Sequence, residues 1–167
     1  LHGLRIGEAL GMTWENIDLE YNTITVNQQL QDISMKLREG TRFETDSYLI
    51  KTIPKTVRSE RNVPPQPPTK KMLLRTAVAE RNGYVFKGQS GTSITYGNYK
   101  KRHFYPVIRA LDLELKTHDL RKFFGSWHLG MNRTDIMTVS KWMGHRDPRV
   151  TMGTYAKVIE ELEMKHQ

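Results

Sequence analysis

Residues 118–155 read HDLRKFFGSWHLGMNRTDIMTVSKWMGHRDPRVTMGTY, and the spacing of their apolar residues predicts three helices. The first helix carries apolar residues at the i, i+3, i+4 and i+7 positions of a core-facing stripe, namely Leu120, Phe123, Phe124 and Trp127. Ile136, Val139 and Met143 predict the second helix, which Gly144 can end, and Asp147-Pro148 is typical of the start of a third. The pair Gly144-His145 is therefore expected between two helices.

The N-terminal part of the chain combines a short helix with strands. A helical pattern is already under way at Ile6, whereas Ile24 and Val26 alternate with threonines as in a strand. Three strands are predicted, the last two antiparallel to each other, at residues 24–26, 48–53 and 58–63. The predicted fold class is mixed α/β (α+β), mostly helical with a small antiparallel three-stranded sheet.

Two more helices are predicted in the middle of the chain. Four prolines between residues 64 and 68 interrupt the strand pattern, and a helical spacing follows at Leu74, Ala77 and Val78 until Gly83. Residues 95–111 form the second helix, with Pro106 as the expected kink. Its predicted core face consists of Phe104, Val107, Ile108 and Leu111.

Length and composition limit the class of protein. At 167 residues and 19.5 kDa the chain has room for one domain with one buried core. A mean hydropathy of −0.62 and the lack of a long apolar run argue against an integral membrane protein. The chain has no cysteine, which excludes disulfide scaffolds, thiolate metal sites and cysteine nucleophiles, and is consistent with a reducing cytoplasm.

Positive charge is concentrated in one stretch. The formal net charge is +8, and residues 70–109 alone carry +8 while residues 1–35 carry −4. Such a stretch favours a polyanionic partner, although a solvated basic face without a partner has the same composition. Lys100, Lys101 and Arg102, which precede the predicted core face of the 95–111 helix, are the candidate DNA-binding residues.

Four short motifs stand in a fixed order along the chain: Gly3-Leu4-Arg5 with Glu8, Lys55-Thr56 with Ser59, Arg61 and Pro64, His118-Asp119-Leu120-Arg121, and Gly144-His145 with Tyr155 ten residues later. Together they resemble the catalytic domain of the tyrosine recombinases, the phage integrase family, whose motifs run G-L-R-x-x-E, K-T-x-x-S-x-R-x-[IV]-P, H-x-L-R, and G-H followed by a tyrosine. Any one of these motifs arises by chance in many proteins. Their joint order predicts the family.

The residue types fit chemistry on a phosphodiester. Attack on the phosphorus builds negative charge on the nonbridging oxygens, so a catalyst without a metal needs fixed cations and hydrogen-bond donors there. Arg5 and Arg121 offer planar forks of donors, and His145 adds one more. From the residues alone, Arg5 could instead pair with Glu8 on the surface, Arg121 could flank an apolar stripe, and His145 could be a core histidine.

The resemblance implies a role for each remaining motif residue. Tyr155 is the nucleophile, His118 takes its proton, and Lys55 protonates the departing 5′ oxygen as general acid. Lys51 also precedes a threonine, but the other motif residues lie at the expected offsets from Lys55. Glu8 is expected to orient its neighbours. The alternative for Tyr155 is core packing beside Val158.

The resemblance implies a site-specific recombinase or integrase that cleaves and rejoins DNA through a 3′-phosphotyrosine, for integration or excision of a phage or conjugative transposon. Neither a metal, nor ATP, nor another cofactor is expected. Residues 1–167 would be a catalytic-domain fragment without the DNA-clamping domain and the first catalytic-domain helix. Double-stranded DNA is the expected partner. A homotetramer is expected in the synaptic complex, a monomer for the isolated fragment, and accessory DNA-bending or excision proteins are further possible partners.

Three other functions share some of these features. A chromosome-dimer-resolving recombinase has the same residues, and a type IB topoisomerase has similar chemistry. A non-catalytic DNA-binding module could have kept the fold. Since every proposed catalytic position is filled, the sequence favours an enzyme over that module.

Overall fold

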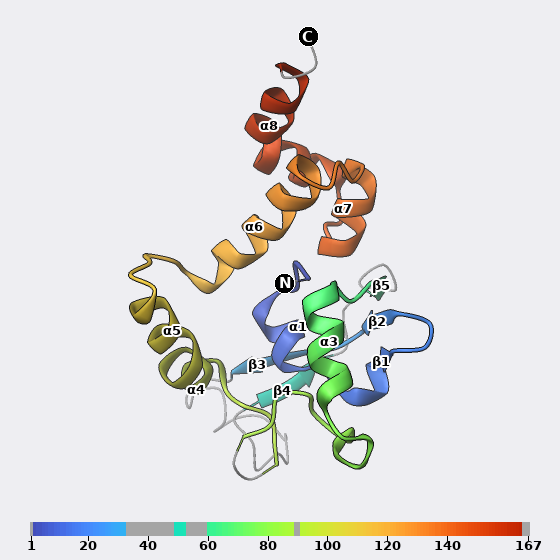
Figure 1. Ribbon diagram of the computed structural model, residues 1–167, viewed down its shortest axis with the longest axis vertical. Helices are drawn as coiled ribbons and strands as arrows, with labels where there is room; N and C mark the ends of the chain where they lie inside the picture. The colour runs from blue at the N-terminus through green and yellow to red at the C-terminus, as the bar shows by residue number, and fades with distance from the viewer. Residues whose placement is uncertain (1, 33–48, 53–59, 89–90, 165–167) are drawn as a thin grey trace, which may run out of the picture.

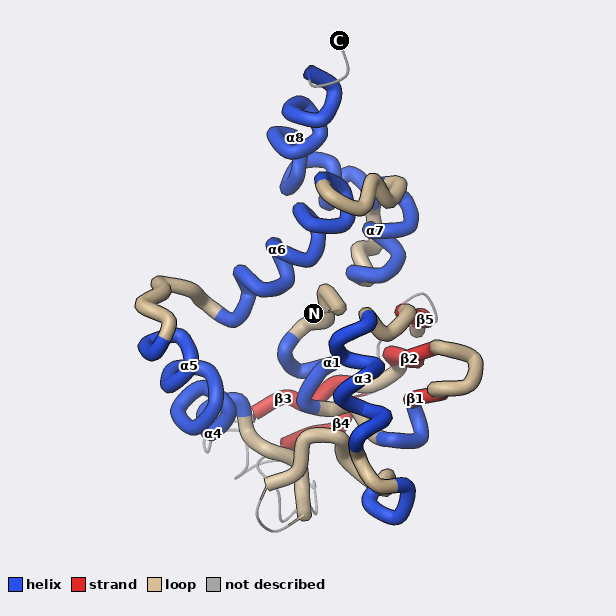
Figure 2. Tube along the Cα trace, in the orientation of Figure 1, coloured by secondary structure: helices blue, strands red, loops and turns tan. Residues whose placement is uncertain are grey.

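The structure, a computed structural model, describes residues 2–32, 49–52, 60–88 and 91–164. Strands and short helices form one part of the molecule, and three helices near the C-terminus form the other (Figure 1). Figure 2 shows the strands gathered below the N-terminus and helices only above it. The predicted class, mostly helical with a small antiparallel three-stranded sheet, is confirmed.

The three-stranded sheet has the order β1-β2-β5, with β1 at Ile17–Asp18, β2 at Thr23–Val26 and β5 at Arg61–Val63. Ile24 and Val26 of β2 are buried, and Thr23 and Thr25, which alternate with them, are half-buried, the period-two pattern of a strand with one covered face. Val26 lies opposite Arg61 in the antiparallel register. This places a charged side chain on the covered face of β5.

The membership of the sheet differs from the prediction. The strand expected at 48–53 is β4, Leu49–Thr52, and it pairs with β3, Gln29–Asp32, in a separate two-stranded sheet. β3 is not predicted from the sequence, because its residues Gln, Leu, Gln and Asp include only one apolar side chain. α1, Ile6–Leu10, packs on β3 through Leu10 and Leu30.

The helix predicted after the prolines is present, but its predicted extent to Gly83 and its predicted apolar face are wrong. α3 spans Pro67–Arg75, and its buried residue is Leu73, while Leu74 is 54% exposed. Prolines in the first turn start this helix because their missing N–H groups would be unpaired there anyway. After an extended Thr76, the chain forms only a 3-10 turn at Val78–Glu80.

Residues 96–110 are helical, with a change of pitch before Pro106. α4, Tyr96–Tyr99, continues into a π-helical segment, Lys100–Phe104, and then into α5, Tyr105–Ala110. The wider π turn lies where the proline ring would otherwise meet the preceding turn. Of the predicted core face, Phe104 is buried and Ile108 is half-buried, but the prediction is wrong for Val107 and Leu111, which are 56% and 60% exposed.

Three helices near the C-terminus enclose the second core: α6 at Thr117–Gly130, α7 at Ile136–Met143 and α8 at Pro148–Met164. The predicted end of α7 and the predicted start of α8 are confirmed. Gly144 ends α7 at φ +67°, and the carboxylate of Asp147 accepts a hydrogen bond from the backbone N–H of Arg149 at 2.9 Å. The core side chains are Phe124, Leu129, Val139, Met143 and Tyr155.

The buried face of α6 is rotated from the predicted stripe. Phe124 is buried, but Phe123 and Trp127 are 51% and 43% exposed and contact each other with ring centroids 5.8 Å apart. The face that is buried also has the i, i+3, i+4, i+7 spacing, but it consists of Arg121, Phe124, Gly125 and His128. The prediction failed because it counted only apolar residues as buried.

Trp142 of α7 packs against the core of the three helices and also against the core of the sheet, so it joins the two parts. The core of the sheet consists of Met12, Ile24, Val26 and Val63. The helix that carries Trp142, α7, contacts α6, α8 and β5. Among the residues that the structure describes, no helix is both long enough and apolar enough to cross a bilayer.

Candidate active site

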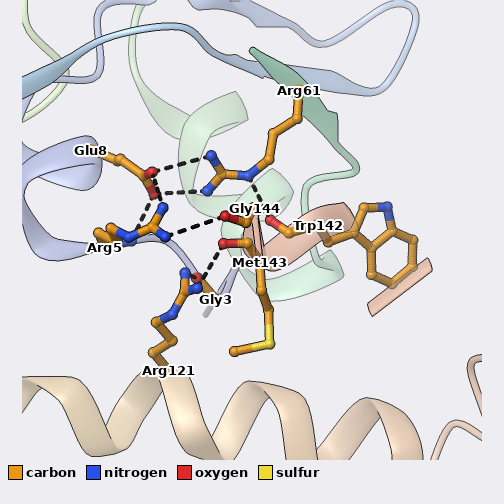
Figure 3. A network of polar contacts seen from close by, with 8 residues as sticks. All are labelled: Gly3, Arg5, Glu8, Arg61, Arg121, Trp142, Met143 and Gly144. Carbon is orange, nitrogen blue, oxygen red and sulfur yellow. Dashed lines mark hydrogen bonds and ion pairs between the residues drawn. The ribbon is translucent and has the colours of Figure 1, made fainter. Parts of the chain in front are cut away.

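The C-terminal end of α7 is surrounded by three arginines from three other elements (Figure 3). Each arginine donates to one of three consecutive backbone carbonyls: Arg61 Nε to Trp142 at 2.8 Å, Arg121 Nη2 to Met143 at 2.7 Å and Arg5 Nη2 to Gly144 at 3.2 Å. The last carbonyls of a helix have no partner inside it and carry partial negative charge. Guanidinium groups donate hydrogen bonds to these carbonyls and carry the opposite charge. The three arginines therefore lie together at this helix end, beside His145.

Glu8 links two of these arginines. Its carboxylate accepts from Arg61 at 2.7 and 3.1 Å, and from the Arg5 side chain and backbone at 3.0 and 2.8 Å. Burial of Glu8 favours its neutral form, but the hydrogen bonds and charges of Arg61 and Arg5 outweigh this effect and lower its pKa. The orienting role expected for Glu8 therefore has a geometric basis.

Arg61 belongs to this cluster although the sequence analysis treated it only as a motif position. Its side chain is 3% exposed and forms a bidentate ion pair with Glu8. The signal that could have found it is strand register: Arg61 and Val63 are both buried in β5 while Asn62 between them is exposed. A charged residue on the covered face of a strand requires a buried partner.

Two motif glycines allow the arginines to approach. Gly144 has φ +67°, and a Cβ there would lie 2.8 Å from the Arg61 guanidinium carbon. Gly3, at φ +63°, offers its carbonyl to Arg121 Nη1 and lies against the Phe124 ring. Any side chain would be strained at both positions.

The two catalytic candidates among the arginines differ in exposure. The Arg5 side chain is 48% exposed, whereas Arg121 is buried, with both of its terminal nitrogens bonded to carbonyls. Burial and the positive charge of Arg5 lower the pKa of Arg121 to about 10, so it remains charged at neutral pH. Arg5 is the guanidinium that an incoming anion can reach first.

His145 follows the three carbonyls directly and is half-buried. Burial, followed by the charges of Arg121 and Arg5, lowers its pKa to about 4. His118 lies in the first turn of α6, exposed and one turn before Arg121, and its charge also acts on His145. At neutral pH His145 is therefore an uncharged hydrogen-bonding group among cations.

Tyr155 lies in the core of the three C-terminal helices. It is 3% exposed, and its hydroxyl donates to the Met143 sulfur at 3.8 Å. Its ring packs so closely on Gly125 of α6 that a Cβ there would overlap it. Burial raises the pKa of the Tyr155 phenol, and the charge of Arg121 offsets part of that rise. The expected nucleophile is close to Arg121 but is packed as a core residue.

The remaining candidates lie elsewhere or outside the described residues. Lys55 is outside them, as is the side chain of Lys51. Lys100 has its ammonium 4.6 Å from the centre of the Tyr96 ring, and Lys101 and Arg102 are exposed on the same π-helical segment. In the part of the chain that the structure describes, no group of three acidic, His or Cys residues could hold a metal ion.

The chain belongs to the phage integrase family, whose model matches residues 1–161. It is 29% identical over 173 residues to a tyrosine recombinase XerC-like protein of Caldanaerobacter subterraneus subsp. tengcongensis, covering 94% of this chain and 43% of that protein. It is 26% identical to the integrase of Staphylococcus phage L54a, covering 98% of this chain and 47% of that protein. The chain therefore spans less than half the length of these two curated relatives.

Solved structures show the same fold. The Tn1549 transposon integrase in complex with circular intermediate DNA matches with a TM-score of 0.73 at 21% identity, over 99% of this chain and 56% of that chain. The XerA recombinase matches with a TM-score of 0.65 at 19% identity, over 99% of this chain and 53% of that chain. The elements that hold Arg5, Arg121, His145 and Tyr155 are thus parts of a recombinase fold.

Proposed function

We propose that residues 1–167 form the catalytic domain of a site-specific recombinase or integrase that cleaves and rejoins double-stranded DNA through a 3′-phosphotyrosine. The observation that carries this proposal is the gathering of Arg5, Arg121 and His145 at the end of α7, next to the helix that bears Tyr155. Family membership supports it.

The cluster suits a phosphate whose negative charge grows during attack. Arg5 can turn its exposed donors to a nonbridging oxygen while Glu8 holds the other side of its guanidinium. His145 adds a neutral donor, and Arg121 adds a positive charge that acts on His145. Fixed donors of this kind stabilise a developing oxyanion without reorganising at the moment of reaction.

The covalent step exchanges one phosphoester for another. The Tyr155 oxygen bonds to phosphorus, the bond from phosphorus to the 5′ oxygen breaks, His118 takes the phenolic proton and Lys55 gives a proton to the 5′ oxygen. Attack by a 5′ hydroxyl on the phosphotyrosine reverses the step. Since one ester replaces another, no ATP is consumed. The arginines and His145 supply the positive charge and donors that a metal would otherwise provide.

Because the Tyr155 hydroxyl points at Met143, attack requires it to leave that contact. The hydroxyl must move from the core toward the carbonyl end of α7, where the arginines lie. Binding of DNA between these elements is the event that we expect to bring this about.

The proposed partner is DNA from a mobile element, such as a phage or a conjugative transposon, with four protomers in the synaptic complex. Lys101 and Arg102 are exposed, and residues 70–109 hold a net charge of +8, as a phosphate-binding surface requires. The relatives include both a phage integrase and a transposon integrase.

The deciding experiment incubates the full-length protein with nicked attachment-site DNA and looks for a covalent adduct on a denaturing gel. We expect an adduct in the native protein, with or without EDTA, and none in Tyr155→Phe, which removes one hydroxyl and almost no volume. An adduct in Tyr155→Phe would refute the nucleophile. DNA binding without any adduct in the native protein would favour the non-catalytic DNA-binding module.

A further inference from the structure

Thr151 connects His145 to the helix that carries Tyr155. It lies in the first turns of α8, four residues before Tyr155, and its side chain is fully buried. Its Oγ1 is 2.7 Å from Nδ1 of His145, the distance of a well-formed hydrogen bond from a hydroxyl. None of the four sequence motifs includes this residue.

The burial of Thr151 decides which of the two groups donates. A hydroxyl has one hydrogen, and in the part of the chain that the structure describes Thr151 has no other hydrogen-bond partner. Thr154, three residues on, shows the usual alternative, because its hydroxyl donates to the carbonyl of Val150 at 2.7 Å. Thr151 makes no such bond to the preceding turn.

If Nδ1 of His145 carried the proton, Thr151 would accept it and its own hydrogen would be left unpaired in a dry site. A buried donor without an acceptor is disfavoured, so Thr151 is the donor and Nδ1 is the unprotonated nitrogen. In a neutral imidazole the proton then resides on Nε2. Burial and the neighbouring arginines, which hold the pKa of His145 at about 4, keep the ring neutral.

We propose that Thr151 is a positioning residue that holds His145 in the tautomer with its proton on Nε2, so that this nitrogen is ready to donate to the scissile phosphate. The role toward phosphate rests on the proposed function, whereas the tautomer does not. A hydrogen bond to the second ring nitrogen commonly sets which nitrogen is available for chemistry.

The direct test is nuclear magnetic resonance of full-length protein labelled with ¹⁵N in its histidines, at neutral pH and without DNA. We expect Nδ1 of His145 to be unprotonated and Nε2 to be protonated in the native protein and in Thr151→Ser. In Thr151→Val, which keeps the shape but lacks the donor, we expect both tautomers. A proton on Nδ1 in the native protein would overturn the proposal even if the valine variant did not fold. An unchanged tautomer in folded Thr151→Val would overturn it too.

A second test follows the consequence for cleavage. The rate of adduct formation in a single turnover should fall about tenfold in Thr151→Val and recover in Thr151→Ser, as expected for loss of one buried hydrogen bond. In a His145→Ala background, Thr151→Val should cause no further loss. A tenfold loss in that background would show that Thr151 acts through packing alone. Failure of the native protein to cleave would refute the proposed function and leave the tautomer measurement as the test of Thr151.

Discussion

The hydroxyl of Tyr155 donates to the sulfur of Met143, and the carbonyl of the same Met143 accepts from Arg121. One residue at the end of α7 therefore contacts the expected nucleophile with its side chain and an expected catalytic arginine with its backbone. A small shift of α8 against α7 would separate Tyr155 from the sulfur while leaving the arginine in place. This contact holds the proposed nucleophile beside the arginine cluster.

The packing of the Tyr155 ring on α6 can be tested at Gly125. Gly125→Ala should destabilise the protein by about 1–3 kcal/mol, because the new methyl group overlaps the Tyr155 ring. Gly153→Ala is the matched control: nothing lies within 4 Å of its Cβ position in α8, so it should stabilise by about 0.5–1 kcal/mol. Urea unfolding of both variants measures the difference. Equal effects at the two glycines would show that Tyr155 does not pack on α6.

Glu8→Gln should cost about 3–5 kcal/mol of unfolding free energy, because it leaves the guanidinium of Arg61 buried without its anion. Glu20→Gln, on the exposed surface, should stay within about 0.5 kcal/mol of the native protein. The pKa of Glu8 is lowered on folding, so its stabilisation is present above its ordinary pKa of 4.5 and is lost as the pH falls through the lowered value. If Glu8→Gln lost unfolding free energy at low pH as steeply as the native protein does, the assignment of this loss to Glu8 would be wrong.

Two histidines, the buried His2 and the half-buried His145, should make the protein less stable in mild acid. Burial lowers the pKa of His2 and of His145 to about 4, from an ordinary value of 6.5. Between pH 6.5 and 4 the unfolded chain takes up protons that the folded chain does not. The free energy of unfolding therefore decreases as the pH is lowered through this window. Unfolding by urea at several pH values measures the slope. His145→Gln should reduce it, and an identical slope would mean that His145 titrates normally.

Arg5→Ala should slow adduct formation by about 100-fold or more, the usual effect of removing one donor to a developing oxyanion. Arg5→Lys keeps the charge but cannot hold Glu8 and the Gly144 carbonyl with a planar fork, so we expect only partial recovery. Single-turnover cleavage of nicked DNA provides the rates. A near-native rate in Arg5→Ala would reduce this residue to a surface partner of Glu8.

The basic segment should contribute to affinity without setting sequence preference. Replacing Lys100 and Lys101 with alanine should make the slope of log K against log salt shallower by about 2, since each phosphate contact releases about 0.9 counterion. Specific and non-specific DNA should weaken alike, because contacts to phosphate carry no base information. The comparison requires full-length protein with its fold verified. An unchanged salt slope would identify a solvated face that does not meet DNA.

Local patterns in the sequence determined the family, the helix boundaries around Gly144 and Asp147, and the residues of the four motifs. These features depend on contacts within a few positions, such as the left-handed glycine that ends α7 and the carboxylate that caps α8. Spacing also predicted the fold class. It could not predict that β4 pairs with β3, because strand pairing depends on partners far along the chain.

Only the tertiary structure decided what lies on the buried face of α6 and what surrounds the end of α7. Arg121, Gly125 and His128 are polar or small, and they are buried because carbonyls of Gly3 and Met143, the Tyr155 ring and an aromatic cluster come from distant segments to meet them. The positions of Arg61 beside Glu8 and of Thr151 beside His145 likewise follow only from the tertiary structure. A buried polar side chain is stable only with its partners, and those partners lie elsewhere in the sequence.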